Sequence, residues 1–238
     1  MAEAQAYLIA AARGAIQSLS GKPLAEQARP ILEQLFQNGI PARRIQEIHW
    51  HGREDEYWLN NLGETQGFSP DIARFFWASA PLIAHSMLHL AARAIEAGER
   101  ELVILAQESG DQVSALLIGS PAAVEESSAA PRLRIANKLV LSSRPNGLSS
   151  AIAAVLTKAG QDPAGVHLIA SARQPAQAAG EKAFANARWL TPGGEIHAGD
   201  YFLLPALADA LEAGQGQRGL LVSEGPQKSS LVTVFERG

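Results

Sequence analysis

The chain has 238 residues, no cysteine and a formal net charge of −4 at neutral pH. The lack of cysteine excludes disulfides, thiolate metal sites and a cysteine nucleophile. Acidic and basic residues are dispersed and form no basic stripe, so we expect neither nucleic acid nor a membrane surface as a partner. The longest apolar run, residues 6–12, is too short to cross a bilayer. Without a secretion signal, we expect a cytoplasmic protein.

The first 50 residues alternate between strand and helix patterns. Three segments carry these patterns, which predict a strand, an amphipathic helix and a second strand: residues 7–12, 23–38 and 45–50. Residues 53–63 are polar and predict a loop or a short helix.

The rest of the chain is organised around residues 72–108. Residues 72–78 are aromatic and predict a strand, residues 82–97 predict a helix, and residues 102–106 predict a further strand. Pro81 stands where proline is tolerated in a first helical turn, and Gly98 ends the helix. Apolar residues cover more than one stripe of this helix, so we expect it to be buried.

The two halves of the chain resemble each other. After a predicted strand at residues 112–119, residues 120–131 (SPAAVEESSAAP) change in composition and predict a linker. We therefore predict an N-terminal half at 1–119 and a C-terminal half at 132–238, joined in one compact unit.

Several segments recur across this linker in the same order. The matching pairs are residues 32–48 with 152–169, Ala94–Gly98 with Ala210–Gly214, 102–106 with 220–223, and 113–118 with 231–235. We predict a tandem duplication of one α/β unit, with mostly parallel sheets covered on both faces.

Four segments, taken together, resemble the thiolase and β-ketoacyl synthase superfamily: residues 6–16 (AYLIAAARGAI), 39–50, 91–109 and 222–237. The resemblance spans nearly the whole chain. It implies an α/β, thiolase-like αβαβα five-layered fold, built from two duplicated α/β halves with mixed, mostly parallel sheets. It also implies a dimer as the minimal unit and a setting in fatty acid or polyketide metabolism.

At the catalytic positions that the resemblance implies, this chain departs from the family. The nucleophilic cysteine opens the first central helix, where the helix dipole lowers its pKa; here that position falls on Pro81. A His or Asn that follows a strand falls near residues 170–173, where neither stands. The histidine that opens the second central helix falls on His197 or on Asp200.

Two further departures follow from the same resemblance. A second family cysteine near the C-terminus is replaced by Ser223 or Glu224. Residues 119–132 leave no room for the loop region that covers the active site and holds coenzyme A in thiolases.

Other polar residues allow both a chemical and a structural interpretation. The candidates are His85 with His89 and His49 with His51 as metal ligands, Ser79 or Ser86 as nucleophile, and Gly193-Gly194 as a phosphate loop. We favour core or interface histidines, a strand end, a helix cap and a tight turn, and we predict no metal site.

The resulting hypothesis is a non-catalytic thiolase- or ketosynthase-like subunit. It would dimerise with itself or with an active ketosynthase or thiolase, as chain-length-factor subunits do. The alternatives are an acyltransferase that depends on acyl-CoA or acyl carrier protein, with a relocated nucleophile, and a module that binds an acyl chain or acyl-CoA. We expect no cofactor, although coenzyme A or an acyl group is compatible with the family. Residues 72–78 should form an edge strand at the dimer interface, through Phe75, Phe76 and Trp77.

Overall fold

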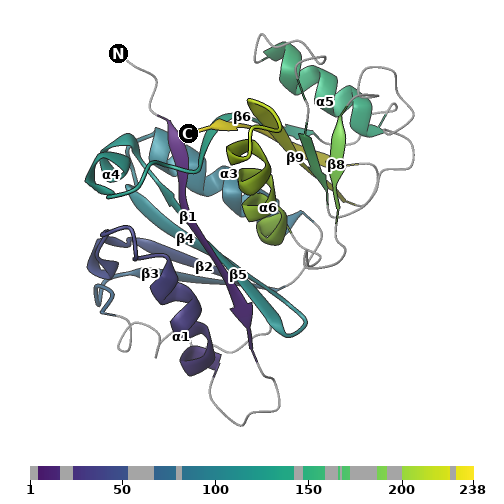
Figure 1. Cartoon of the computed structure of the whole chain (residues 1–238). Coiled ribbons are helices and arrows are strands. Elements are labelled where there is room, and N and C mark those ends of the chain that lie inside the picture. The colour runs from purple at the N-terminus through teal and green to yellow at the C-terminus, as the bar shows by residue number, and fades with distance from the viewer. Residues whose placement is uncertain are drawn as a thin grey trace. The chain divides into compact units, whose positions relative to one another are not determined.

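The structure is a computed structural model of the whole chain (Figure 1). It describes residues 5–16, 24–52, 67–78, 82–141, 147–158, 166, 168–171, 187–191, 200–225 and 229–238. The chain divides into two compact units. Unit 1 comprises Met1–Ser79 and Met87–Arg132, and unit 2 comprises Ala80–Ser86 and Leu133–Gly238.

Unit 1 is a five-stranded mixed sheet with helices. Its elements are β1 (Ala6–Ala15), α1 (Leu24–Gln34), a 3-10 turn (Ala42–Arg44), β2 (Glu47–Gly52), β3 (Ala73–Ala78), α3 (Ile83–Glu96), β4 (Leu102–Ser109), β5 (Gln112–Gly119) and α4 (Pro121–Glu126). The strand order is β3-β2-β4-β5-β1. Strand β2 runs parallel to β3 and β4, whereas β5 runs antiparallel to β4 and β1. The first turn of α3 belongs to unit 2 and the rest of this helix to unit 1.

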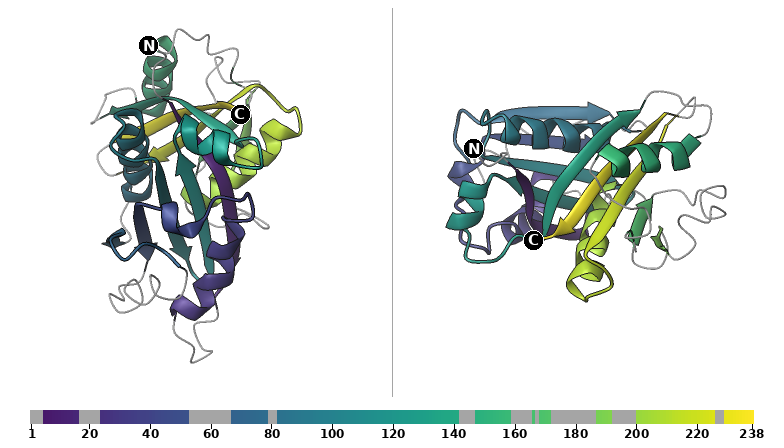
Figure 2. Two further views of the ribbon diagram at one scale, coloured as in Figure 1. Left: turned by 90° about the vertical axis from the view of Figure 1, so that its left-hand side faces the viewer. Right: turned by 90° about the horizontal axis from the view of Figure 1, so that it is seen from above.

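The side chains of β2 alternate between the two faces of the unit 1 sheet, and one of these faces carries the apolar core. Ile48 and Trp50 of β2 are fully buried in a cluster with apolar residues of α1, such as Ile31 and Leu32. Helix α1 packs on β1 and β5 (Figure 2). The alternate residues of β2, which include Glu47 and His49, therefore face the opposite side of the sheet.

Unit 2 has the same arrangement. Its elements are β6 (Leu133–Leu141), α5 (Gly147–Lys158), β7 (Leu168–Ser171), β8 (Arg188–Leu190), α6 (Asp200–Glu212), β9 (Arg218–Glu224) and β10 (Ser230–Arg237). The strand order is β8-β7-β9-β10-β6. Strand β7 runs parallel to β8 and β9, and β10 runs antiparallel to β9 and β6.

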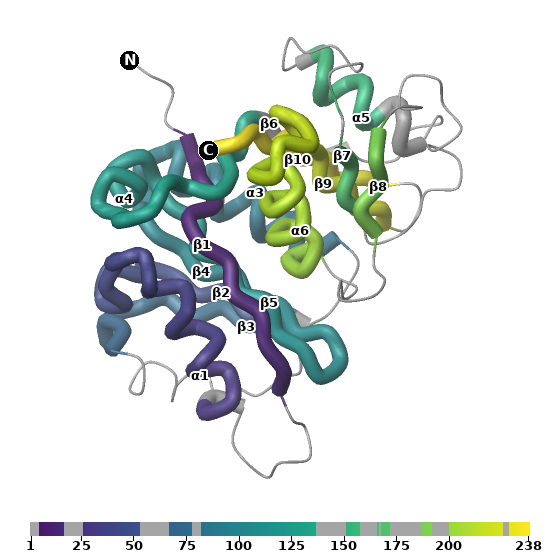
Figure 3. Tube along the Cα trace, viewed as in Figure 1, coloured from purple at the N-terminus to yellow at the C-terminus, as the bar shows by residue number. Residues whose placement is uncertain are grey.

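Helices α5 and α6 lie on different faces of the unit 2 sheet. Helix α5 packs on β6 and β10, and its Ile152 and Val155 share a core with Val222 of β9 and Val232 of β10. Helix α6 packs on β7 and β9 (Figure 3). Because side chains alternate along a strand, Ser223 and Thr233 point away from the α5 face.

The two units share this strand order, and helices α3 and α6 end in the same way. Gly98 after α3 and Gly214 after α6 have φ of 74° and 77°. In each case the next N–H reaches back to a carbonyl five residues earlier, from Glu99 to Ala94 and from Gln215 to Ala210. Both ends are Schellman motifs, which require a left-handed residue that only glycine adopts without strain.

One expectation about the fold needs correction. The sheets are mixed rather than mostly parallel, because each unit has as many antiparallel as parallel strand pairs. The short turn at Gly110, with φ of 62°, can join β4 only to an antiparallel neighbour. Residues 120–131, which the sequence predicts as a linker, contain α4, which Ser120 caps and whose Ala123 is fully buried in unit 1.

The polar segment at residues 53–63 lies outside the described residues. Within the described ranges, no helix is both long and apolar enough to cross a membrane.

Candidate functional site

The backbone is strained where helix α3 begins. Leu82 directly precedes Ile83, the first residue of α3, and has φ of 68°. It is the only described residue other than glycine with a positive φ. Such a conformation costs on the order of 1–3 kcal/mol and is kept only where the surroundings impose it. The Leu82 carbonyl accepts the first helical hydrogen bond, from Ser86, at 2.8 Å.

The Leu82 side chain packs against a glycine at the end of β9. A β-carbon built on Gly225 would lie 2.5 Å from Cδ1 of Leu82, which is closer than real β-carbons approach other atoms. The Gly225 N–H donates to the Ser229 carbonyl at 2.9 Å. Leucine therefore fills the space above this turn, and the N–H of the turn has a partner within the protein.

Next to Leu82, a buried polar network joins four elements of unit 2. The Ser223 hydroxyl lies 2.6 Å from Oδ1 of Asp200 and 2.7 Å from Nδ1 of His85. The other ring nitrogen of His85, Nε2, lies 2.7 Å from Oγ1 of Thr233. His85 and Thr233 are fully buried, and Asp200 and Ser223 are each 7% exposed.

The first residue of α6 reaches the first turn of α3. Asp200 accepts a hydrogen bond from the backbone N–H of His85 as well as from Ser223. This N–H is one of those that a helix leaves without an internal partner at its N-terminus. The Asp200 carboxylate therefore occupies a position that favours negative charge. Tyr201 provides a second hydrogen bond between α6 and the first turn of α3, because its hydroxyl donates to the Ala84 carbonyl at 2.7 Å.

Burial controls the ionisation of this cluster. It raises the pKa of Asp200 from 3.8 to about 6, against the opposing effect of the hydrogen bonds from Ser223 and His85. Burial and the nearby Asp200 charge raise the pKa of Tyr201 well above its usual value. The Asp200 carboxyl therefore changes its charge near pH 6.

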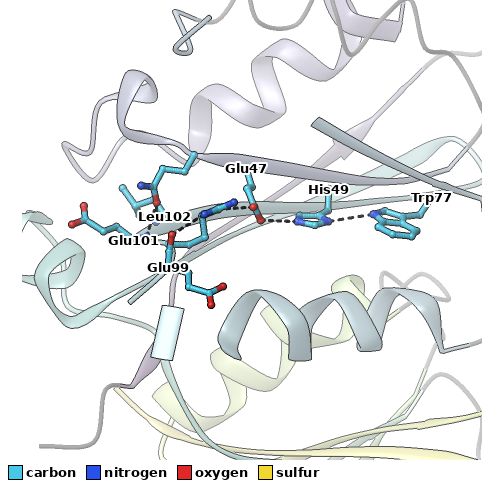
Figure 4. Close-up of polar contacts among 8 residues, drawn as sticks. Glu47, His49, Trp77, Glu99, Glu101 and Leu102 are labelled. Atoms are coloured by element: carbon cyan, nitrogen blue, oxygen red, sulfur yellow. Dashed lines mark hydrogen bonds and ion pairs between the residues drawn. The ribbon is translucent and has the colours of Figure 1, made fainter. Parts of the chain in front are cut away.

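A second polar row lies in unit 1 (Figure 4). Arg100 donates to Oε1 of Glu47 at 2.5 Å, and Oε2 of Glu47 lies 3.2 Å from Nε2 of His49. Trp77 donates its indole N–H to Nδ1 of His49 at 3.2 Å. Because an indole nitrogen can only donate, Nδ1 of His49 must accept and Nε2 must carry the proton toward Glu47. Burial lowers the pKa of His49, which agrees with a neutral ring.

Aromatic rings of the edge strand stack on this histidine. The His49 ring lies 4.8 Å from Phe75 with an interplanar angle of 17°, and 6.3 Å from Trp77 with an angle of 8°. Phe75 is 39% exposed. Phe76 packs against the buried core of unit 1 instead. Strand β3 is the outermost strand of its sheet, so Phe75 and Trp77 stand at a sheet edge.

Comparison with known proteins identifies the fold. OleA of Xanthomonas campestris, in a structure with bound lauric acid and lauroyl-CoA, matches with a TM-score of 0.69 at 14% identity, over 93% of this chain and 84% of that one. A Glu-to-Gln variant of the same enzyme matches with a TM-score of 0.74 at 13% identity, over 98% of both chains. FabH, the 3-oxoacyl-(acyl carrier protein) synthase III of Xanthomonas oryzae, matches with a TM-score of 0.71 at 12% identity, also over 98% of both chains.

The chain has a thiolase-like fold. No protein-family model matches its sequence, and no curated protein matches it either. At 12–14% identity, these likenesses establish the fold alone. The resemblance predicted from the sequence is therefore confirmed for the architecture of thiolase-like condensing enzymes.

The structure brings together two of the five residues that the sequence placed at thiolase-like catalytic positions. Asp200 and Ser223 share a hydrogen bond, whereas Pro81 and His197 lie outside the described residues. Leu82 is the described residue that directly precedes the helix. Glu224 follows Ser223 at the end of β9 and is half-buried.

The remaining sequence candidates have varied positions. Ser171, in the segment 170–173, ends β7 and is 1% exposed. Ser86 lies within α3, while Ser79 and Gly193-Gly194 are outside the described ranges. His85 and His89 are both buried but belong to different units. The described residues contain no group of three or more side chains that is suited to hold a metal ion.

Sequence reasoning missed the network itself. The sequence predicts a core or interface role for His85, and nothing in it distinguishes Thr233 from other strand residues. The hydrogen-bonded pairs His85–Ser223 and His85–Thr233 are separated by 138 and 148 positions in the chain. The only available signal was the polar character of Ser223 and Thr233 within apolar strands.

Proposed function

We propose that this chain is a non-catalytic thiolase- or ketosynthase-like subunit, a pseudoenzyme that associates with itself or with an active member of the same superfamily. The observation that carries the proposal is the position of the Leu82 side chain at the start of α3. The family resemblance puts a nucleophile where the first central helix begins, and by the sequence this position is Pro81. Leu82, the described residue that directly precedes the helix, packs its side chain on Gly225. The full sequence has no cysteine to replace it.

Asp200 supports the same proposal. Acyl-transfer sites use helix N-terminal N–H groups to stabilise a developing oxyanion. In this chain the Asp200 carboxylate already accepts from the His85 N–H. An internal anion at this position competes with any acyl oxygen.

The finer architecture follows from the same family. We infer the five-layered αβαβα arrangement of two duplicated halves. It is supported by the repeated strand order of the two units and by the match to FabH over 98% of both chains.

Assembly through β3 completes the proposed function. An edge strand presents unpaired backbone groups, and proteins rarely leave such an edge open beside aromatic surface. Phe75 on this strand is 39% exposed and stacks on His49. We infer that β3 pairs with its copy in a homodimer, or with the matching strand of a ketosynthase or thiolase partner.

Assays of the purified protein with acyl-CoA substrates test the lack of catalysis. We expect no thiolysis, condensation or decarboxylation. We also expect no activity from Leu82→Cys or Pro81→Cys, because catalytic groups that act together are strongly non-additive and the expected His or Asn is missing from residues 170–173. Turnover by wild type, abolished by an acylating probe at a mapped residue, would refute the proposal.

Ser223 favours one alternative, an acyltransferase with a relocated nucleophile. Its hydroxyl lies 2.7 Å from Nδ1 of His85, as a serine and its general base do. Exposure to acyl-CoA followed by intact-mass measurement distinguishes the two functions. An acyl adduct in wild type that is missing in Ser223→Ala supports the enzyme, and the absence of any adduct supports the pseudoenzyme.

A third function, binding of an acyl chain or acyl-CoA, has an experiment of its own. OleA has been solved with lauric acid and lauroyl-CoA, which makes such ligands natural probes. Native mass spectrometry of the purified protein would reveal a co-purified lipid or added lauroyl-CoA. Retention of either without turnover would favour a binding module.

A further inference from the structure

Four polar side chains of unit 2 form a linear hydrogen-bond network. Asp200 of α6 contacts Ser223 of β9, Ser223 contacts His85 of α3, and His85 contacts Thr233 of β10. The three separations are 2.6, 2.7 and 2.7 Å, which are hydrogen-bond distances for each pair of atoms. Ser223, His85 and Thr233 can each both donate and accept a hydrogen bond. The direction of all three hydrogen bonds in this network therefore depends on the protonation of Asp200.

When Asp200 is ionised, donor counting permits one arrangement around a neutral histidine. A carboxylate only accepts, so Ser223 must use its single hydroxyl proton toward Asp200. The contact between Ser223 and His85 then needs a proton on Nδ1 of His85. A neutral His85 consequently has a bare Nε2, which accepts from the Thr233 hydroxyl.

When Asp200 is protonated, donor and acceptor can be exchanged in all three hydrogen bonds of this network. The carboxyl O–H donates to Ser223, and Ser223 donates to Nδ1 of His85. His85 then carries its proton on Nε2 and donates to Thr233. No side chain needs to move more than a hydroxyl rotation, since the heavy-atom distances serve both directions.

We propose that Asp200, Ser223, His85 and Thr233 form a buried proton switch. In it, uptake of one proton reverses three hydrogen bonds and changes the tautomer of a neutral His85. The switch goes beyond the proposed function and does not depend on it. The proton balance is complete: one proton enters, Asp200 ends with one more, and Ser223, His85 and Thr233 keep their number. Burial raises the pKa of Asp200 to about 6, so both states are reached under mild conditions.

The surroundings of Asp200 contain few competing charges among the described residues. On α6, Tyr201 is adjacent and stays protonated because its pKa is raised. The ends of α3 and β7 near the cluster contribute the uncharged residues Ala84 and Ser171.

Three charged residues of the other strands that pack on α6 have partners elsewhere, namely Arg188, Arg218 and Glu236, and Arg237 is exposed at the end of β10. Arg218 of β9 pairs with Glu236 of β10 at 2.8 Å. Because Arg218 precedes Ser223 by five residues in β9, the two residues are roughly 16 Å apart along the strand. Arg188 of β8 donates to Gln215, which follows the far end of α6. Glu224 neighbours Ser223 in β9, and alternation directs its side chain to the other face.

The switch changes what Ser223 can do. In the ionised state its proton is held by Asp200, and His85 cannot act as its base because Nδ1 is occupied. In the protonated state Ser223 donates to His85, which is the pairing of a serine nucleophile with a histidine base. Any reactivity of Ser223 toward acyl groups would therefore depend on the state of Asp200.

Nitrogen NMR of the full-length protein with labelled histidine tests the switch directly. Long-range proton–nitrogen correlations identify which ring nitrogen of His85 is protonated. We expect the proton on Nδ1 at pH 8 and on Nε2 at pH 5. The midpoint should coincide with that of the Asp200 carboxyl carbon signal. The same tautomer at both pH values, or protons on both nitrogens at either, would overturn the proposal.

Two variants on one helix sharpen the experiment. Asp200→Asn offers an amide N–H to Ser223 and should lock His85 in the Nε2-protonated form at every pH. Asp209→Asn removes an exposed carboxyl of α6 and should leave the His85 titration unchanged. A tautomer change that persists in Asp200→Asn would also refute the switch. The wild-type titration alone remains decisive if a variant fails to fold.

Discussion

Leu82 and Gly225 are in such close contact that only glycine fits beside the leucine. A β-carbon at position 225 would lie 2.5 Å from Cδ1 of Leu82 and 2.7 Å from Oγ of Ser229. We predict that Gly225→Ala destabilises the protein by about 1–3 kcal/mol, the range for overpacked sites. Urea unfolding measures this loss.

The double variant Leu82→Ala, Gly225→Ala assigns the cause. Removing the leucine side chain should recover part of the loss, because one of the two close contacts disappears while Ser229 remains. The coupling free energy of this cycle is the quantity of interest. Strictly additive effects would mean that Leu82 and Gly225 do not press on each other.

The buried Asp200 carboxyl makes stability depend on pH in an unusual direction. Its pKa is raised from 3.8 to about 6 in the folded protein, so between these values the folded state holds a proton that the unfolded state has lost. Stability from this group is therefore highest below pH 4 and falls as the pH rises through 6. A shift of about two pKa units corresponds to about 3 kcal/mol.

Asp200→Asn should remove this dependence. The difference in unfolding free energy between variant and wild type, measured from pH 4 to pH 7.5, cancels the contribution of all other groups. We expect the variant to gain about 3 kcal/mol relative to wild type over this range. Parallel curves would show that Asp200 titrates normally.

The repeated architecture could be predicted from the sequence because its signals are local. Ala94–Gly98 and Ala210–Gly214 share a helix end whose glycine has a required backbone conformation, and the structure gives both the same Schellman motif. Apolar runs such as residues 102–106 likewise marked buried strands. The pairing directions were harder, because parallel and antiparallel partners of one apolar strand have nearly the same sequence pattern.

The candidate site was only half predictable. Asp200 and Ser223 were found through family positions, whereas His85 joined them only in three dimensions. Helix periodicity places His85 on one face of α3 but does not say that Ser223 and Thr233, more than 130 positions later, lie opposite it. A pairing across such a distance depends on how the strands of unit 2 are arranged, which periodicity does not encode.

His49 gives unit 1 the opposite response to acid. Burial lowers its pKa, so as the pH falls below about 6.5 the unfolded state takes up a proton that folded His49 refuses. Protonation would also place a second N–H against the indole N–H of Trp77, which only donates. Acid should therefore destabilise this part of the protein.

His49→Gln tests this response. The variant should lose stability at pH 7.5, where the contacts with Glu47 and Trp77 are intact in wild type. Its deficit should shrink as the pH is lowered to 5, because only wild type carries the penalty for a neutral buried histidine. Thermal melts of both proteins at each pH provide the comparison, and a constant deficit would contradict the expected pKa shift.

The edge strand β3 allows the last prediction, on assembly. Phe75 is 39% exposed on the outermost strand of the unit 1 sheet, so a charge placed there should not disturb the core. If β3 pairs with its copy, Phe75→Lys brings two like charges and two hydrophilic side chains into the interface. We expect the Kd of the dimer to rise at least tenfold, measured by multi-angle light scattering over a dilution series. Ala122→Lys, which adds the same charge on an exposed position of α4, should leave the dimer intact. A wild type that stays monomeric at micromolar concentration, or a Phe75→Lys variant that remains as dimeric as the Ala122→Lys control, would exclude homodimer formation through β3.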